Sequence, residues 1–157
     1  MTGFSGLQRL IYASRWMDPT HAEIEPMVAD ILDKSVRNNR TVGITGLLLH
    51  HRGWFLQVLE GPLEVVDDTF DRIRRDLRHT DIRTVADLPI AARAFGDWSM
   101  AAERLEGQTA RALTELGLDA SFDPASLDPS SAMSLLLSAR TARLKALDQP
   151  HLAGRVA

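Results

Sequence analysis

The chain has 157 residues, a net charge of −3 and a pI of about 5.9. Its length suffices for one domain with a hydrophobic core, or for one domain with an appendage. The mildly acidic balance argues against nucleic acid as the main partner, because phosphate binding needs a concentrated basic surface.

Cysteine is absent from the chain, which excludes disulfides, thiol nucleophiles and thiolate metal sites. His50 and His51 are neighbours on an expected strand, where they point to opposite faces and cannot chelate one metal ion, so we predict no metal site. No stretch approaches the roughly 18 apolar residues of a membrane span, and the first residues show no signal-peptide pattern. We therefore expect a cytoplasmic protein without membrane contact.

The first elements are predicted to be a strand and a helix. Residues 7–14, LQRLIYAS, alternate so that Leu10, Tyr12 and Ser14 share one face while Ile11 and Ala13 share the other. A helix follows from about residue 23 to Asn38 and Asn39. Its apolar stripe follows helical spacing and consists of Ile24, Met27, Val28, Ile31 and Leu32.

Two central strands come next. Residues 42–51 and 53–61 form nearly continuous apolar runs with a short break between them, which predicts a hairpin. Strands of this kind are usually covered on both faces.

A second helix and two more strands complete the first part of the chain. The helix is predicted over residues 63–79, and residues 81–100 are predicted to form two strands broken near Pro89. The helix stripe consists of Val66, Phe70, Ile73 and Leu77. The order β-α-β-β-α-β-β predicts an α+β, ferredoxin-like sheet with two helices on one face.

Composition changes after about residue 103. A short helix, a polar linker and a last helix are expected there, the last helix capped by Asp128 with Pro129 at its first position. Its apolar side is predicted to hold Met133, Leu136, Leu137, Leu144 and Leu147. We predict that this pair of helices covers the bare sheet face; a partner surface is the alternative. The expected division is therefore a domain over residues 1–102 and a helical extension over 103–157.

Gln57 is a primary amide at the centre of an otherwise apolar strand, GWFLQVLEGP. A buried amide without partners is destabilising by about 1–3 kcal/mol, so Gln57 needs either a protein partner or a ligand. If the first and third strands are neighbours, Tyr12 lies beside it and the phenol and amide can form a hydrogen bond.

These residues belong to a set of segments that occur in a characteristic order: LIYAS, ILDKSVRNNRTVGITGLLL, GWFLQVLEGP, RIRRDLRH and RAFGDWSM. Together they resemble the BLUF domain, a blue-light sensor that uses flavin. The resemblance extends from about Leu7 to Met100.

The resemblance implies a noncovalent flavin between the two helices, FAD in most members, with FMN or riboflavin as alternatives. It assigns Tyr12 as electron donor, Gln57 as the switching amide and Asn39 as the partner of the flavin pyrimidine edge. Trp98 and Met100 match a semi-conserved pair on the last strand, of which Trp98 lies near the glutamine or out in solvent. The other positions that surround the cofactor in the family are Ser14, Ile31, Phe55, Ile73, Arg78 and His79.

Each assignment has a purely structural alternative. Asn39 is also a plausible helix C-cap, and Asn38 could take that role while Asn39 faces the ligand. The arginines of RIRRDLRH also fit a solvated helix face with i,i+4 pairs at Asp68–Arg72 and Asp71–Arg75. For Trp98 and Met100 the structural alternative is a role in packing alone.

The resemblance implies a photoreceptor and not an enzyme. Light would drive electron and proton transfer from Tyr12 to the flavin and rearrange the hydrogen bonds of Gln57. The 55 residues that follow position 102 are too few for a cyclase or a cyclic-dinucleotide phosphodiesterase. We therefore expect output through a downstream protein or through self-association, with a homo-oligomer expected.

Two other functions are open to the same fold. One is a light-insensitive interaction module without a photocycle. The other is an acylphosphatase-like enzyme, which needs an arginine-bearing phosphate loop after the first strand. The segment SRWMDPTHAEIEP there has no glycine-rich cradle.

Overall fold

The computed structural model describes residues 6–17, 24–51, 53–104, 107–116 and 123–147, apart from the side chains of residues 24–25 and 107–108. The predicted start of the first helix at residue 23, the side chain of Ile24 and part of the predicted linker lie outside the described residues.

A mixed five-stranded sheet forms the centre of the protein. Its strands lie in the order β4-β1-β3-β2-β5, as the ferredoxin-like pattern predicts for the first four. All neighbours are antiparallel except β2 and β5. The strands are β1 (Leu7–Trp16), β2 (Thr45–His51), β3 (Trp54–Pro62), β4 (His79–Ile90) and β5 (Ala102–Arg104).

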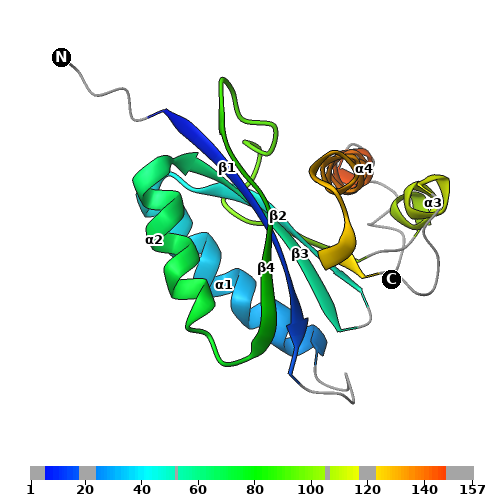
Figure 1. Ribbon diagram of the computed structural model, residues 1–157, viewed down its shortest axis with the longest axis horizontal. Helices are drawn as coiled ribbons and strands as arrows, with labels where there is room; N and C mark the ends of the chain where they lie inside the picture. Colours follow the sequence, from blue (N-terminus) through cyan, green and yellow to red (C-terminus); the bar gives the residue numbers. More distant parts are fainter. Residues whose placement is uncertain (1–5, 18–23, 52, 105–106, 117–122, 148–157) are drawn as a thin grey trace.

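Two helices, α1 (Ile24–Val42) and α2 (Leu63–Arg74), lie on one face of this sheet (Figure 1). The even-numbered residues of β1 and the odd-numbered residues of β3 point toward them. The core on this face contains Leu10, Tyr12, Val28, Phe55, Leu59, Val66 and Phe70. The prediction of an α+β fold with two helices on one face is confirmed.

The C-terminal helices α3 (Gly107–Glu115) and α4 (Pro129–Leu147) cover the opposite face, with the 3₁₀ turn η1 (Pro124–Ser126) between them in sequence (Figure 1). Their core pairs Ile11, Leu47, Leu49 and Val58 of the sheet with Leu113, Leu135 and Leu136. The prediction that these helices cover the second sheet face is therefore confirmed, and the continuous apolar runs of β2 and β3 follow from burial on both sides.

Helix α4 begins as predicted, because Asp128 Oδ1 accepts a hydrogen bond from the Ser131 amide at 2.7 Å. The predicted buried side of α4 was wrong in part: Leu137 is 37% exposed and Leu147 is 55% exposed. The helix instead buries two alanines at helical spacing with two leucines, which are Ala132, Leu135, Leu136 and Ala139. Small side chains let a helix approach a sheet closely, and counting only large apolar residues missed this face.

The ends of both N-terminal helices differ from the prediction. Helix α1 continues beyond Asn38 and Asn39 to Val42, and it is followed by Gly43 at a φ of 82°, a conformation that favours glycine. Asn39 is therefore an internal helical residue and not the cap. Helix α2 ends at Arg74, so Leu77 falls outside the helix and is 90% exposed instead of buried.

The segment after α2 contains one long strand instead of two. Strand β4 continues through Pro89, which an edge strand tolerates because its outer side needs no ladder hydrogen bonds. Residues 91–101 are irregular and lead into the short β5. Trp98 and Met100 therefore precede the last strand instead of lying on it.

A buried carboxylate holds this irregular segment against the sheet. Glu60 is fully buried, and it accepts hydrogen bonds from the Phe95 amide at 2.6 Å, the Ala94 amide at 3.1 Å and Arg9 Nε at 2.8 Å. Arg93 adds bonds to the Gly43 carbonyl and to Thr45 Oγ1, both at 2.7 Å. These contacts fix residues 93–95 against the sheet. The carbonyls of Trp98 and Ala101 then accept hydrogen bonds from the Gly46 and Leu48 amides of β2, at 3.1 and 2.7 Å.

Candidate functional site

Tyr12 and Gln57 face each other across β1 and β3, as direct partners in the antiparallel register. The Tyr12 hydroxyl donates a hydrogen bond to Gln57 Oε1. Both side chains are only 4% exposed. The buried amide thus has the phenol as a protein partner, in a place where an unpaired polar group would be strongly destabilising.

The other end of the Gln57 amide points to Met100. Gln57 Nε2 donates to Met100 Sδ at 3.3 Å. A thioether is a weak acceptor, so this half of the amide is held less strongly than the half bound to Tyr12. The hydrogen bond from Tyr12 fixes the orientation of the amide, with its oxygen toward the phenol and its nitrogen toward Met100.

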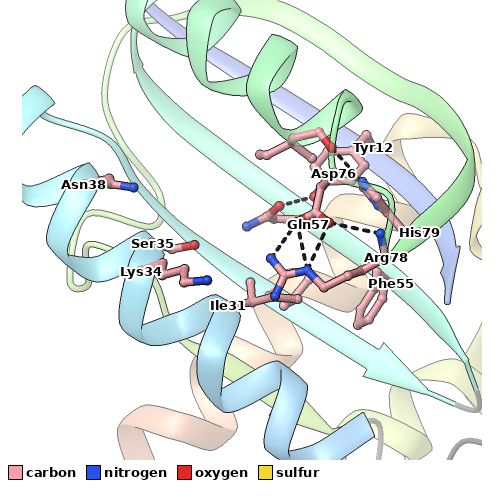
Figure 2. Close-up of a pocket in the computed structure, with 12 residues that line it drawn as sticks. Tyr12, Ile31, Lys34, Ser35, Asn38, Phe55, Gln57, Asp76, Arg78 and His79 are labelled. Carbon is pink, nitrogen blue, oxygen red and sulfur yellow. Dashed lines mark hydrogen bonds and ion pairs between the residues drawn. The ribbon is translucent and has the colours of Figure 1, made fainter. Parts of the chain in front are cut away.

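A cavity lies above this pair, between α1 and α2. Figure 2 shows side chains of α1 along one side and Tyr12, Gln57, Asp76, Arg78 and His79 along the other. Its apolar lining comprises Ile31, Leu48, Phe55 and Ile73. A second cavity shares Gln57, Ile73, Arg78 and three α1 residues with the first, and is additionally lined by Asn39, Leu59, Thr69 and Arg72. Together they form a continuous hollow with apolar walls and polar groups at defined points.

Asn39 enters this hollow from the last turns of α1. Its side chain is 3% exposed, and Nδ2 donates to the Ser99 carbonyl at 2.8 Å. Asn39 therefore contacts the same irregular segment that brings Met100 to Gln57. A carboxamide can donate and accept at once, which suits the edge of a heteroaromatic ring.

His79 connects the cavity wall to the fully buried Ser14. Its Nε2 lies 2.7 Å from the Ile73 carbonyl and its Nδ1 lies 2.8 Å from Ser14 Oγ. A carbonyl only accepts, so Nε2 carries the proton, and in the neutral ring Nδ1 accepts from the serine hydroxyl. Ser14 thus contributes by orienting His79, which lines the cavity.

Arg78 closes one side of the cavity through ion pairs. Its guanidinium contacts Asp76 at 2.5 Å and Asp30 of α1 at 3.0 Å. The hydrogen bonds from Arg78 lower the pKa of Asp76, and those from Lys34 and then Arg78 lower the pKa of Asp30. Both carboxylates are therefore ionised at neutral pH.

The Tyr12 phenol is neutral in this environment. Burial raises its pKa well above the ordinary value, and the negative charge of Asp76 raises it further. Tyr12 therefore provides a hydroxyl and not a phenolate, and any electron that it loses must be accompanied by a proton.

Trp98 and Met100 lie on different sides of the sheet. Met100 is 5% exposed and packs with the α1–α2 core beside Gln57. Trp98 packs against the opposite core, and the Arg143 guanidinium of α4 lies 5.1 Å from its ring centroid. Strand alternation would place residues two apart on one face, but residues 97–101 are irregular. Trp98 therefore takes neither of the two expected positions, near the glutamine or out in solvent, and packs beside α4.

Several residues of the hollow were missed or set aside at the sequence level. Lys34, Ser35 and Asn38 line it together with the predicted Ile31, at i+3, i+4 and i+7 from it, a helical spacing that could have identified this polar–apolar face of α1. Asp76 and Thr69 carried no signal of their own. Arg72 is exposed, as expected for a solvated helix face, and it also borders the second cavity. On the same helix, Asp71 contacts the exposed Arg74 at i+3, at 4.0 Å.

The residues present fit a flavin. A tricyclic ring needs apolar walls, which Ile31, Phe55 and Ile73 supply, and amide partners for its polar edge, which Asn39 and Gln57 supply. One buried hydroxyl of this hollow, Thr69 Oγ1, has no hydrogen-bond partner within the described residues. An uncompensated buried group at a ligand cavity is what a site for a polar cofactor would show in a structure of the chain alone.

The fold and site define a ferredoxin-like domain with a phenol–amide pair beneath a ligand cavity, and the comparisons with known proteins agree. The family described as "BLUF: Sensors of blue-light using FAD" matches residues 7–101. The chain belongs to the BLUF family.

Similar proteins include subunits of photoactivated adenylate cyclases. Photoactivated adenylate cyclase subunit beta of Euglena gracilis is 37% identical over 100 residues, which are 63% of this chain and 11% of that protein. The alpha subunit is 32% identical over 108 residues, which are 69% of this chain and 10% of that protein. This chain thus matches only about a tenth of the length of these cyclase subunits.

Two solved structures are similar over nearly their whole length. BlsA in its photo-activated state superimposes with a TM-score of 0.78 at 28% identity, over 85% of this chain and 94% of that one. The dark state of BlrB, a BLUF protein, superimposes with a TM-score of 0.64 at 35% identity, over 82% of this chain and 97% of that one. Within the described part of the chain, no helix has the length and apolar character needed to cross a membrane.

Proposed function

We propose that this protein binds FAD and reports blue light through Gln57 to the irregular segment and the C-terminal helices. The observation that carries this proposal is the continuous chain from the Tyr12 hydroxyl through the Gln57 amide to Met100. It links a redox-active phenol to residues 97–101, which contact α4 through Asp97 and lead into β5.

The cofactor would be held by Asn39 and Gln57 at its polar edge and by Ile31, Phe55 and Ile73 against its rings. FAD is favoured by the description of the family, while FMN and riboflavin carry the same ring system and would be accepted by the same walls. Lys34, Arg72 and Arg78 line the second cavity and would suit a phosphate group.

When bound, a flavin supplies blue-light absorption and an electron acceptor in its excited state. Tyr12 can give up an electron together with the proton that it donates to Gln57. The Gln57 amide can respond by rotating or by changing tautomer, without a change in net charge. Either response would replace the weak bond from Gln57 Nε2 to Met100 by a different contact.

We propose that residues 1–102 are the sensor and residues 103–157 the output extension, with β5 running across this boundary. Arg140 contacts Asp97 at 3.1 Å and Arg143 contacts Glu103 at 3.1 Å, so α4 is paired with both ends of the segment that contains Met100. A change at Met100 would then alter a surface for a downstream protein or a second copy of the chain. A few kcal/mol of differential affinity between dark and illuminated states is sufficient for such signalling.

The Tyr12→Phe variant tests the role of the phenol. It should keep its flavin, with an affinity within about threefold of the wild type, because the Tyr12 hydroxyl donates its hydrogen bond to Gln57 and not to the flavin. It should lose the reversible red shift under blue light, as measured by absorption spectroscopy. Tyr12 is the only tyrosine of the chain, so a photocycle that persisted in this variant would contradict the proposal.

The Asn39→Ala variant tests the binding role of α1. It should bind flavin about tenfold more weakly or worse, because a buried polar edge would lose its partner. Flavin release is measured by fluorescence as the loaded protein is diluted. Thr41→Val, also on α1 but outside both cavities, is the control. Wild-type affinity in the Asn39 variant would refute this assignment.

A further inference from the structure

Thr69 is a helical threonine whose hydroxyl has no partner. It lies in α2, its side chain is 6% exposed, and Oγ1 is buried without a hydrogen bond to any described residue. Thr69 also lines a separate groove along α2 with Val65 and Arg72, but its Oγ1 is buried from the surface. A buried hydroxyl in this situation is destabilising unless something else binds it.

Other threonines in the helices of this protein show what such a side chain ordinarily does. Thr41, Thr114 and Thr141 each donate to the carbonyl four residues earlier, at 3.2, 3.3 and 3.0 Å. Thr69 could satisfy itself in the same way but does not. Its hydroxyl is thus left available for a group outside the chain.

The position of Thr69 identifies that group. Thr69 lines the second cavity together with Asn39, Gln57 and Leu59. Asn39 comes from α1 and Thr69 from α2, so the two polar side chains border one cavity from different helices. If Asn39 binds the pyrimidine edge of the flavin, as proposed above, the carbonyl oxygens of that edge are acceptors that the bound ring brings into the cavity that Thr69 also lines.

We propose that the Thr69 hydroxyl donates a hydrogen bond to a pyrimidine carbonyl of the bound flavin, which makes Thr69 a cofactor-binding residue. This inference rests on the proposed flavin function and adds a donor from α2 to the contacts of α1 and β3. The hydroxyl then has its partner only when the cofactor is present.

The test compares Thr69→Val, which keeps the shape and removes the hydroxyl, with Thr69→Ser, which keeps the hydroxyl. Flavin affinity is measured by fluorescence on dilution of the loaded protein. The valine variant should bind about three- to tenfold more weakly, and the serine variant should stay within about twofold of the wild type. Thr41→Val, whose hydroxyl bonds its own helix, should leave the affinity unchanged.

Two further measurements separate binding from a structural effect. The infrared carbonyl band of the bound flavin should move to higher frequency in Thr69→Val and not in Thr69→Ser, because a lost hydrogen bond stiffens the carbonyl. The loss of affinity should be equal for lumiflavin, which has the ring system but no ribityl chain.

An unchanged affinity in Thr69→Val, or an unchanged carbonyl band, would overturn the inference. A loss confined to flavins with a ribityl chain would overturn the assignment to the pyrimidine edge. Failure of the wild-type protein to bind any flavin would instead refute the proposed function itself, so the two failures are distinguishable.

Discussion

Replacing Gln57 by leucine is expected to abolish the reversible light-induced red shift and to alter the dark absorption spectrum, while flavin remains bound. Leucine fills a similar volume between Tyr12 and Met100 but can neither accept from the phenol nor donate to the thioether. The Tyr12 hydroxyl would then be a buried donor without its partner, and no amide would remain to reorganise. Absorption spectra in darkness and under blue light measure both effects.

Gln8→Leu is the matched control for this variant. Gln8 is a largely buried amide on the same strand as Tyr12, but it bonds Asp87 and lines neither cavity. It should cycle as the wild type does. A normal photocycle in Gln57→Leu, or an equal loss in Gln8→Leu, would show that the amide beside Tyr12 has no special role.

Replacing Glu60 by leucine is expected to lower the free energy of unfolding by about 3 kcal/mol or more. The change removes the acceptor of two backbone amides, Ala94 and Phe95, and leaves the largely buried Arg9 without its carboxylate. Urea denaturation followed by circular dichroism measures the difference. Asp33→Asn, which breaks an ion pair whose side chains are 69% exposed, should change stability by less than about 0.5 kcal/mol.

Substitution of Glu60 should also affect the photocycle, because Glu60 anchors Ala94 and Phe95. The segment that they begin continues to Ser99 and Met100, which contact Asn39 and Gln57. Glu60→Gln keeps an acceptor for one backbone amide and should fold well enough for spectroscopy. We expect its recovery in darkness to differ from the wild-type rate. A loss of stability below about 1 kcal/mol in Glu60→Leu would mean that Glu60 does not anchor this segment.

The parts of the fold that follow short-range periodicity could be predicted from the sequence. Alternation in β1 places Tyr12 and Ser14 on one face, and the ferredoxin-like order makes β1 and β3 neighbours, so Tyr12 meets Gln57 directly. The continuous apolar runs of β2 and β3 indicated a second covering layer, which α3 and α4 provide.

The errors concern features that depend on tertiary contacts. Gly43, and not Asn38 or Asn39, follows the end of α1, because a positive φ is required there and the helical pattern continues up to it. Residues 91–101 look like a strand in composition, but the amides of Ala94 and Phe95 bind the Glu60 carboxylate, and the segment bonds β2 through isolated carbonyls, at Trp98 and Ala101. Trp98 therefore packs with the core beneath α3 and α4, on the sheet face opposite to Met100. The alternation of a strand would have placed these two residues on the same face.

The candidate site was predictable only where a residue type is unusual in its place. A glutamine in an apolar strand attracts notice, whereas Thr69 in an ordinary amphipathic helix does not. Its relevance arises from a missing hydrogen bond, which no sequence pattern reports. Asp76 likewise becomes relevant only through its contact with Arg78 across the turn.

The light-minus-dark absorption spectrum of the flavin-loaded wild-type protein tests the central claim most directly. We predict a small red shift of the flavin bands under blue light that reverses completely in darkness, because only the hydrogen bonds around Gln57 change. A spectrum that stays the same under illumination, or a colourless protein that cannot be loaded with FAD, would contradict this account and favour a light-insensitive interaction module.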